Sequence, residues 1–388
     1  ETKSSYNIRL KTTDAAGESF EQAFSLSVKD IDESTWTQIG AAINGEASYD
    51  QSGESVSLSA DGSILAIGAR WNDGNGNTSG HVRVYKNANN TWTQVGSDID
   101  GESSSDQSGE SVVLSNDGSI LAISAKFNDG NGSESGHVRV YKNINNTWTQ
   151  IGSDIDGEAL NDKSGESIAL SADGSILAIG ASQNDGNGTR SGHVRVYKNI
   201  NDTWTQIGSD IDGESAGDRS GLSISLSGDG SVLAIGAPAN NENGTESGHV
   251  RIYKNVNDTW TQVGEDIDGE AANDQSGCSI NLSNDGSIIA IGAKGNSGNT
   301  LNSGHVRIYK NVNDIWTQVG EDIDGPGLND WSGTALSLSD DGSILAIGAP
   351  SNDDNGSDSG QVRIYRLSSN TNQTPTAIAL SGASFNEN

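Results

Sequence analysis

The sequence has no methionine and a single cysteine among its 388 residues. Because Cys278 stands alone, no disulfide can form within the chain. The missing methionine leads us to expect that the chain begins inside a longer protein. We find no signal peptide and no run of about 20 apolar residues, the length of a membrane span, so we expect no direct membrane insertion.

Positive charge is also scarce, because 22 Lys and Arg stand against 53 Asp and Glu. The resulting net charge of -31 repels nucleic acid and anionic lipid, and we exclude both as partners. Such acidity has two explanations, a solvated acidic surface or divalent cations acting as counterions. Hydrophobic residues make up only 32%, but they recur in regular patterns and so do not indicate disorder.

The dominant feature that is present is a repeat. The stretch GHVRVYKNANNTWTQVG at residues 80–96 returns at 136–152, 192–208, 248–264 and 304–320. Trp36 and Trp92 lie 56 positions apart, and Trp148, Trp204, Trp260 and Trp316 continue that spacing. A period of this length indicates an architecture built from repeated structural units.

Each repeat predicts four strands, which in the first full copy span residues 55–59, 63–69, 81–86 and 91–95. Asp61-Gly62 predicts a tight hairpin turn between the first two strands. Four-stranded meanders in series make a β-propeller, so we predict an all-β fold with six blades. An elongated β-solenoid is the alternative.

The two ends of the repeat region complement each other. The sixth copy stops after its third strand at residues 361–366, whereas residues 35–39 form a fourth strand with no blade before it. We therefore expect the N-terminal strand to close the ring, which removes an open sheet edge. The predicted domains are a hairpin at 1–33, the propeller at 34–366, and a linker with the first strand of a following domain at 367–388.

Several short stretches resemble known repeats. Ser52-Gly53, Leu65-Ala-Ile-Gly-Ala69 and Gly80-His-Val-Arg-Val-Tyr85 resemble the FG-GAP repeat of integrin alpha-subunit propellers, and the Asp-Gly-Ser hairpins are similar to WD-repeat blades. The resemblance implies a propeller fold. It departs where Ser replaces the Phe of "FG", and the long calcium loop of integrins between the first two strands is absent, so the integrin metal sites are not carried over.

The ends of the chain resemble a different family. The alternating stretches that begin at Tyr6 and Phe24, and the tail that begins at Asn372, are similar to parts of bacterial cadherin-like repeats. The resemblance implies partial β-sandwich flanks. It also implies calcium binding by acidic residues at domain junctions, here Asp14, Asp30, Asp32 and Glu387, which are otherwise ordinary polar turn residues.

Two long loops per blade lie on one face of the predicted disc, and both are acidic. The loop from the fourth strand to the next blade carries an Asp-x-Asp pair, and the loop between the second and third strands carries Asp-x-Asn. Clustered oxygen donors suit calcium, although turn capping explains the same residues. The predicted calcium ligands are Asp98, Asp100, Asp154, Asp156, Asp210, Asp212, Asp266, Asp268, Asp322 and Asp324, with Asp73, Asn75, Asp129, Asn131, Asp185, Asn187, Asp353 and Asn355.

Four propeller aromatics do not follow the repeat, and all lie in the long loops: Tyr49, Trp71, Phe127 and Trp331. On a closed ring of six blades they fall in one sector. Aromatic rings among Asp, Asn and Gly suit a glycan or peptide surface, whereas separate local packing of each ring is the alternative.

No catalytic constellation stands apart from the repeat. The five histidines share one register at the start of the third strand, which indicates a structural role. We therefore predict a monomeric, non-enzymatic module of an extracellular or cell-surface protein, which binds a glycan or protein with the help of calcium. The alternatives are a spacer or calcium-rigidified scaffold and, ranked last, a propeller hydrolase or lyase.

Overall fold

The computed structural model describes residues 5–13, 19–27 and 38–367, in which every regular element is a β-strand. The chain divides into two compact units, Glu1–Ala42 and Ile43–Asn388. In the first unit, β1 (Ser5–Thr13) and β2 (Ser19–Ser27) pair as the predicted antiparallel hairpin. The cadherin-like character of this hairpin stays a prediction, and Asp14, Asp30, Asp32 and Glu387 lie outside the described residues.

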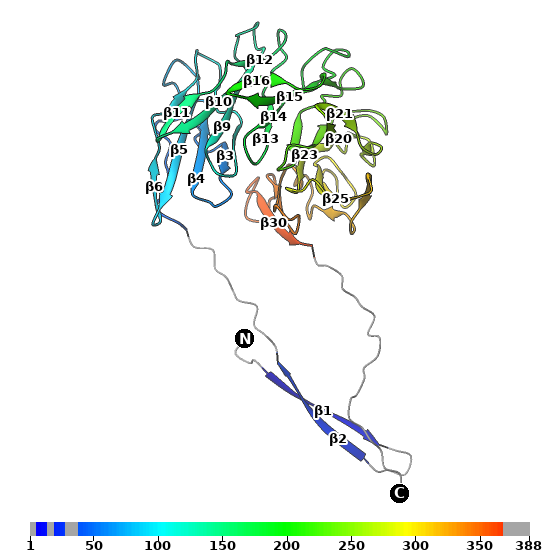
Figure 1. The fold of residues 1–388 in the computed structure, drawn as a ribbon. Helices are drawn as coiled ribbons and strands as arrows, with labels where there is room; N and C mark the ends of the chain where they lie inside the picture. Colours follow the sequence, from blue (N-terminus) through cyan, green and yellow to red (C-terminus); the bar gives the residue numbers. More distant parts are fainter. Residues whose placement is uncertain (1–4, 14–18, 28–37, 368–388) are drawn as a thin grey trace. The chain divides into compact units, whose positions relative to one another are not determined.

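The second unit contains six antiparallel sheets in chain order, one for each repeat (Figure 1). Blade one contains β3 (Ser55–Leu58), β4 (Ile64–Ala69), β5 (His81–Ala88), β6 (Thr91–Gln94) and β7 (Ile99–Asp100). Blade two contains β8 (Val112–Leu114), β9 (Ile120–Ala125), β10 (His137–Ile144), β11 (Thr147–Gln150) and β12 (Ile155–Asp156). Blade three contains β13 (Ser167–Leu170), β14 (Ile176–Ala181), β15 (His193–Ile200), β16 (Thr203–Gln206) and β17 (Ile211–Asp212).

Blade four contains β18 (Ser223–Leu226), β19 (Val232–Ala237), β20 (His249–Val256), β21 (Thr259–Gln262) and β22 (Ile267–Asp268). Blade five contains β23 (Ser276–Leu282), β24 (Ile288–Ala293), β25 (His305–Val312), β26 (Ile315–Gln318) and β27 (Ile323–Asp324). Blade six contains β28 (Ala335–Leu338), β29 (Ile344–Ala349) and β30 (Gln361–Arg366). The prediction of an all-β propeller with six blades of four-stranded design is confirmed.

Each of the first five blades carries one strand that the sequence did not predict. This two-residue strand pairs with the start of the third strand, as β7 pairs with β5 so that Asp100 lies opposite His81. The same pairing recurs in blades two to five. It draws the loop that leaves each blade back onto the histidine that begins the third strand.

The hydrophobic core lies between neighbouring blades. Val82 and Val84 of β5 pack in one buried cluster with Leu121 and Ile123 of β9, and Trp148 of β11 packs against it. Burying each such aliphatic side chain stabilises the fold by about 1.5–3 kcal/mol. Trp204, Trp260 and Trp316 pack in the same way on the next three clusters. The fifth cluster, between blades five and six, includes Tyr365 and no tryptophan from the described residues.

The tight turns between first and second strands join the blades on the short-turn face. Ala60 N donates to the carbonyl of Asn116 at 2.9 Å, and equivalent bonds continue from turn to turn as far as Asp340. Within each turn an aspartate accepts hydrogen bonds, as Asp61 does from the Ser59 hydroxyl and the Ser63 amide. These bonds hold the inner strands of successive blades at one level around the axis.

Blades one and six are the first and last of the series, and each has an apolar face that no neighbouring blade covers among the described residues. Val362 and Ile364 of β30 are 67% and 66% exposed, whereas the equivalent Val82 and Val84 of β5 are buried. Val56 of blade one is 60% exposed, whereas Val112 at its position in blade two is buried. The strand predicted to close the ring lies mostly outside the described residues, so closure by it stays a prediction.

Candidate metal centre

The candidate centre lies on the long-loop face, where the two loops of each blade are joined. The amide of Asn75 donates to the carbonyls of Gly101 and Glu102 at 2.8 and 3.1 Å, and Asn131, Asn187 and Asn243 repeat the pair of bonds. In blade three, a Cβ on Gly213 would lie 2.0 Å from the carbonyl oxygen of Ser191. The two loops are therefore held against each other. Their close approach also explains why a glycine such as Gly213 follows the Asp-x-Asp pair.

The predicted calcium ligands between the second and third strands serve as turn residues. Asp73 Oδ1 accepts the Thr78 amide at 2.7 Å, and Asp129, Asp185 and Asp353 accept the equivalent amides. Asn75, Asn131 and Asn187 hold the neighbouring loop, and Asn355 lies at that position in blade six. Calcium at these residues stays a prediction.

One Asp-x-Asp pair lines an acidic hollow. Around blade two, Glu102, Asp129, Asp154 and Asp156 line one hollow together with Asp106. The first aspartate of each pair accepts a glutamine amide, as Asp154 does from Gln150 at 2.6 Å. Asp98, Asp210, Asp266 and Asp322 accept the equivalent bond, and Asp100, Asp156, Asp212, Asp268 and Asp324 lie in the short strands.

The histidines, which the sequence indicated to be structural, each lie among carboxylates. His81 Nδ1 is 3.8 Å from Glu46 Oε2 and 3.9 Å from Asp98 Oδ2. The same Glu–His–Asp group recurs four more times, as Glu102–His137–Asp154, Glu158–His193–Asp210, Glu214–His249–Asp266 and Glu270–His305–Asp322. Blade six has Gln361 in place of the histidine. In each group the glutamate comes from the preceding blade's loop, so only the fold brings the three residues together.

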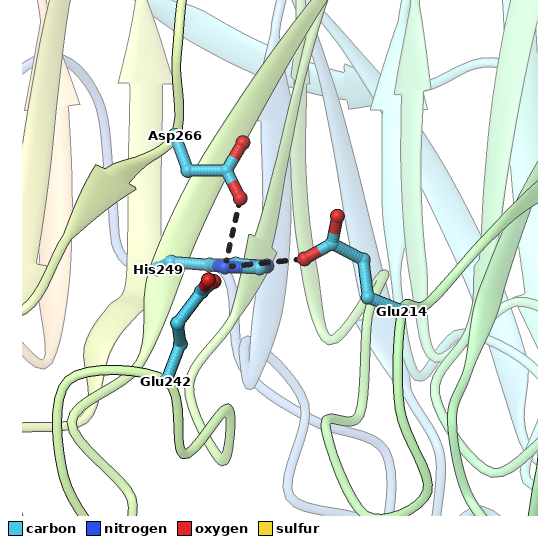
Figure 2. A group of neighbouring side chains, drawn as sticks. All are labelled: Glu214, Glu242, His249 and Asp266. Carbon is cyan, nitrogen blue, oxygen red and sulfur yellow. Dashed lines mark ion pairs between the residues drawn. The ribbon is translucent and has the colours of Figure 1, made fainter.

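Blade four differs from the other copies by one further carboxylate. Glu242 joins Glu214, His249 and Asp266, with the ligand atoms of all four residues within 4.8 Å of one another (Figure 2). Gly74, Gly130, Gly186 and Gly298 occupy the position of Glu242 in the other four histidine blades. Three carboxylates and Arg251 leave two negative charges on this group, compared with one on the others. We call these four residues the blade-four group.

His249 differs from the other four histidines in its hydrogen bonding. It is fully buried, and neither of its ring nitrogens has a hydrogen-bond partner among residues 38–367. Asp218 Oδ1 and Asp268 Oδ1 are likewise buried without a partner there. Burial lowers the pKa of His249, against the pull of Asp266, so the imidazole is neutral at pH 7. Burial raises the pKa of Glu214 against the opposing charge of Arg251, and Asp266 and Glu242 raise it further.

Two contacts within the blade-four group have the spacing of ligands on one divalent ion. His249 Nδ1 lies 3.4 Å from Asp266 Oδ2 and 3.9 Å from Glu214 Oε2. The bonds from such an ion to ligand nitrogen or oxygen atoms are about 2.0–2.2 Å long. Two ligand atoms at the tetrahedral angle are therefore about 3.4 Å apart, and no two ligand atoms of one ion can be more than about 4.4 Å apart. A mixed set of imidazole and carboxylate suits a zinc- or manganese-type ion, whereas calcium prefers oxygen alone.

The four irregular aromatics are each held differently. Trp71 lies under the Arg70 guanidinium at 5.3 Å, and Phe127 lies under Lys126 and Lys163 at 5.4 and 4.9 Å. Tyr49 is 91% exposed and Trp331 is 44% exposed. Two of the four thus carry a cation against the ring, an arrangement that the sequence alone did not indicate. Their role in binding stays a prediction.

Comparison with known proteins supports the propeller. Residues 40–85 and 210–253 match the model of the FG-GAP repeat, and no curated protein matches the chain. The chain is similar to the structure of the periplasmic gluconolactonase PpgL of Pseudomonas aeruginosa, with 15% identity and a TM-score of 0.58 over 94% of this chain and 92% of that chain. It is also similar to a candidate 6-phosphogluconolactonase of Bacteroides uniformis, with 11% identity and a TM-score of 0.54 over 95% and 93%.

These findings correct two predictions from the sequence. The FG-GAP resemblance of the propeller is confirmed. The predicted adhesion or ligand-recognition module, and the prediction that the chain is not an enzyme, are wrong, because the similar propellers are named as lactonases. Treating every carboxylate and histidine as part of the repeat also overlooked Glu242, which departs from it. At 15 and 11% identity the likeness itself establishes a shared fold.

A search of the described residues finds no helix that is long and apolar enough to cross a membrane.

Proposed function

We propose that the propeller is a metal-dependent hydrolase that opens a lactone, the cyclic ester of a hydroxy acid, at the blade-four group. The observation that carries the proposal is Glu242, a carboxylate that departs from the repeat beside the buried His249, whose ring nitrogens have no hydrogen-bond partner among the described residues. Two distant relatives in fold are named as lactonases, which supports a cyclic ester as the substrate.

The residues of the blade-four group divide into two tasks. A bound divalent ion supplies a Lewis acid for an ester carbonyl and makes water easier to deprotonate. His249, Asp266 and Glu214 would hold the ion, and the added negative charge of Glu242 would strengthen its binding at this blade. Arg251 positions Glu214, because its Nη1 lies 3.6 Å from Glu214 Oε1 while its Nη2 donates to the Asp212 carbonyl at 2.6 Å.

Glu242 is suited to act as the general base. It comes from the exposed loop between β19 and β20, so its carboxylate can reach both solvent and a bound substrate. It would take the proton that water loses on adding to the carbonyl carbon. The ring C–O bond then breaks, Glu242 gives its proton to the leaving ring oxygen, and the product is an open hydroxy acid.

The test measures hydrolysis of glucono-δ-lactone by the full chain, after treatment with a chelator and after addition of zinc, manganese or calcium. We expect activity that needs a divalent ion. Because a positioned base contributes about 10²–10⁴ in rate, Glu242→Gly should lower kcat at least about 100-fold.

The glycine variant is a conservative change for the fold. It restores the residue that four other blades have at this position. Glycine suits the position, because in blade two a Cβ on the equivalent Gly130 would lie only 2.9 Å from Asn128 Oδ1. The matched control is Asp354→Gly, which removes the carboxylate at the same register of blade six, where no histidine is present. The proposal fails if no metal restores hydrolysis, or if the two variants behave alike.

Calcium remains the proposed ion for the acidic hollow around blade two. Glu102, Asp129, Asp154 and Asp156 offer carboxylate oxygens, which calcium takes as ligands. Glu102 and Asp154 also belong to the Glu102–His137–Asp154 group, so a calcium ion would use the oxygen donors there and leave His137 aside.

The setting of the propeller is part of the proposal. The FG-GAP match and the periplasmic relative support a location outside the cytoplasm. The flanking hairpin would belong to a cadherin-like domain. Residues 35–39 would form the fourth strand of blade six, which would bring the exposed faces of blades one and six together.

A further inference from the structure

The loops of neighbouring repeats meet at the same two positions throughout the long-loop face. At each meeting point, the backbone amide of a residue in the later loop donates to the backbone carbonyl of a residue in the earlier loop. Lys163 donates to Glu134 in this way, and Arg219 donates to Arg190, both at 3.1 Å. The other copies are Thr78 with Gln107, Glu246 with Gln275, and Asn302 with Trp331. The two residues are therefore neighbours in each of these five copies.

In two copies these neighbouring side chains satisfy each other. Lys163 Nζ forms an ion pair with Glu134 Oε2 at 3.3 Å. Gln275 Nε2 donates to Glu246 Oε2 at 2.8 Å. A complementary pair at this point joins the two loops without needing anything from solution.

The third copy instead places two arginines there. Arg190 and Arg219 are both exposed and both adopt a positive φ, 54° and 57°, so the shared loop conformation fixes where the side chains begin. Within residues 38–367, neither guanidinium has an ion-pair partner, although the chain has 53 acidic residues. At the same meeting point in the two copies above, a carboxylate contacts a cation or an amide, whereas here two cations lie next to each other without a carboxylate partner among the described residues.

The arginine pair lies on the loops that position the blade-four group. Asn187, three residues before Arg190, donates to the Glu214 carbonyl at 3.0 Å. Arg219 directly follows Asp218, whose carboxylate accepts the Asn240 amide at 3.2 Å. Asn240 Oδ1 in turn accepts the Glu242 amide at 2.9 Å. Glu214 and Glu242 are thus connected to the two arginines through short hydrogen-bonded paths.

We propose that Arg190 and Arg219 bind the anionic group, a carboxylate or a phosphate, of the substrate that is opened at the blade-four group. The inference rests on the proposed function and deepens it by naming the substrate class. Guanidinium groups match the planar geometry of carboxylate and phosphate oxygens. A net charge of -31 would repel such a ligand, so a cationic anchor on the loops that carry the site is what an acidic substrate requires.

The experiment measures binding by calorimetry at low ionic strength, using inorganic phosphate, gluconate and 6-phosphogluconate as probes for the full chain. The test variant Arg190→Glu rebuilds the glutamate–cation pair that Glu134 and Lys163 form. The control Lys142→Glu changes the net charge equally on an exposed strand residue of blade two. Unchanged circular dichroism would show that both variants fold.

We expect Arg190→Glu to weaken binding of at least one anion tenfold or more, and Lys142→Glu to leave it unchanged. Loss confined to gluconate supports a carboxylate ligand, and loss confined to inorganic phosphate supports a phosphate. The proposal is overturned if the full chain binds none of the three probes, or if both variants bind as it does. Arginine-dependent binding without any lactone hydrolysis would support the anion site and contradict the proposed function alone.

Discussion

Glu242 changes the chemistry of one blade without changing its fold. The four histidine blades with glycine at this position keep the Glu–His–Asp group, and their His–Asp distances are 3.8–4.0 Å. In blade four that distance is 3.4 Å, and the extra carboxylate adds a second uncompensated negative charge. A divalent ion is the simplest species that neutralises two charges at once.

Asp341, a residue of the turn between β28 and β29, makes part of the stability of the fold depend on pH. Asp341 Oδ1 accepts the Ser339 hydroxyl at 2.7 Å and the Ser343 amide at 2.9 Å, and these bonds lower its pKa from 3.8 to about 2. Its contribution to stability is therefore present above about pH 4 and is lost as the pH falls through about 2. We predict that Asp341→Asn lowers the Tm most above pH 4, with a difference that shrinks toward pH 2.

The neighbouring Asp340 provides the control for this prediction. It is equally exposed, but only its backbone carbonyl takes part in the turn, as acceptor for the Asn284 amide. Asp340→Asn should therefore leave the Tm nearly unchanged across the same pH range. A pH-independent loss in Asp341→Asn would show that the charge of this carboxylate does not contribute.

At the scale of strands and loops, local sequence patterns were enough to predict the main strands and the hairpin turns. Alternating residues such as those at 55–58, and the Asp-Gly turn at residues 61–62, predict strands and hairpins because period and turn chemistry are local properties. The two-residue strand β7 has no pattern of its own. It forms because His81 offers an unpaired edge to Asp100, which only the folded blade reveals.

The blade-four group was missed for a related reason. Its residues come from the loop before blade four, the loop between β19 and β20, the start of β20 and the loop before β22. Spacing along the chain does not show that these loops converge. A signal was nevertheless present, because aligning the copies places Glu242 against glycine in every other blade that has a histidine.

At the scale of the whole molecule, the fifth interblade core differs from the other four. The four preceding cores each have a tryptophan from a fourth strand, whereas the fifth has none among the described residues. Trp36 has the repeat spacing of those tryptophans. We predict that Trp36→Ala lowers the Tm of the full chain about as much as Trp204→Ala does, because large-to-small changes in packed cores cost a few kcal/mol, about 3–5 for a fully buried tryptophan.

This comparison tests ring closure directly. Trp204 packs against the core between blades two and three, so its loss calibrates the cost of one missing ring. If Trp36→Ala melts like the unaltered chain while Trp204→Ala is destabilised, residues 35–39 do not complete blade six.

The central claim is that one blade, and not five, holds a tightly bound ion. The most direct measurement is the metal content of the full chain after exposure to zinc or manganese and removal of loosely bound ions, with Glu242→Gly measured beside it. We predict one ion for each chain and close to none in the variant. Equal metal content in both proteins, or about five ions in each, would contradict the claim, because the groups with glycine at this position would then bind as well as blade four.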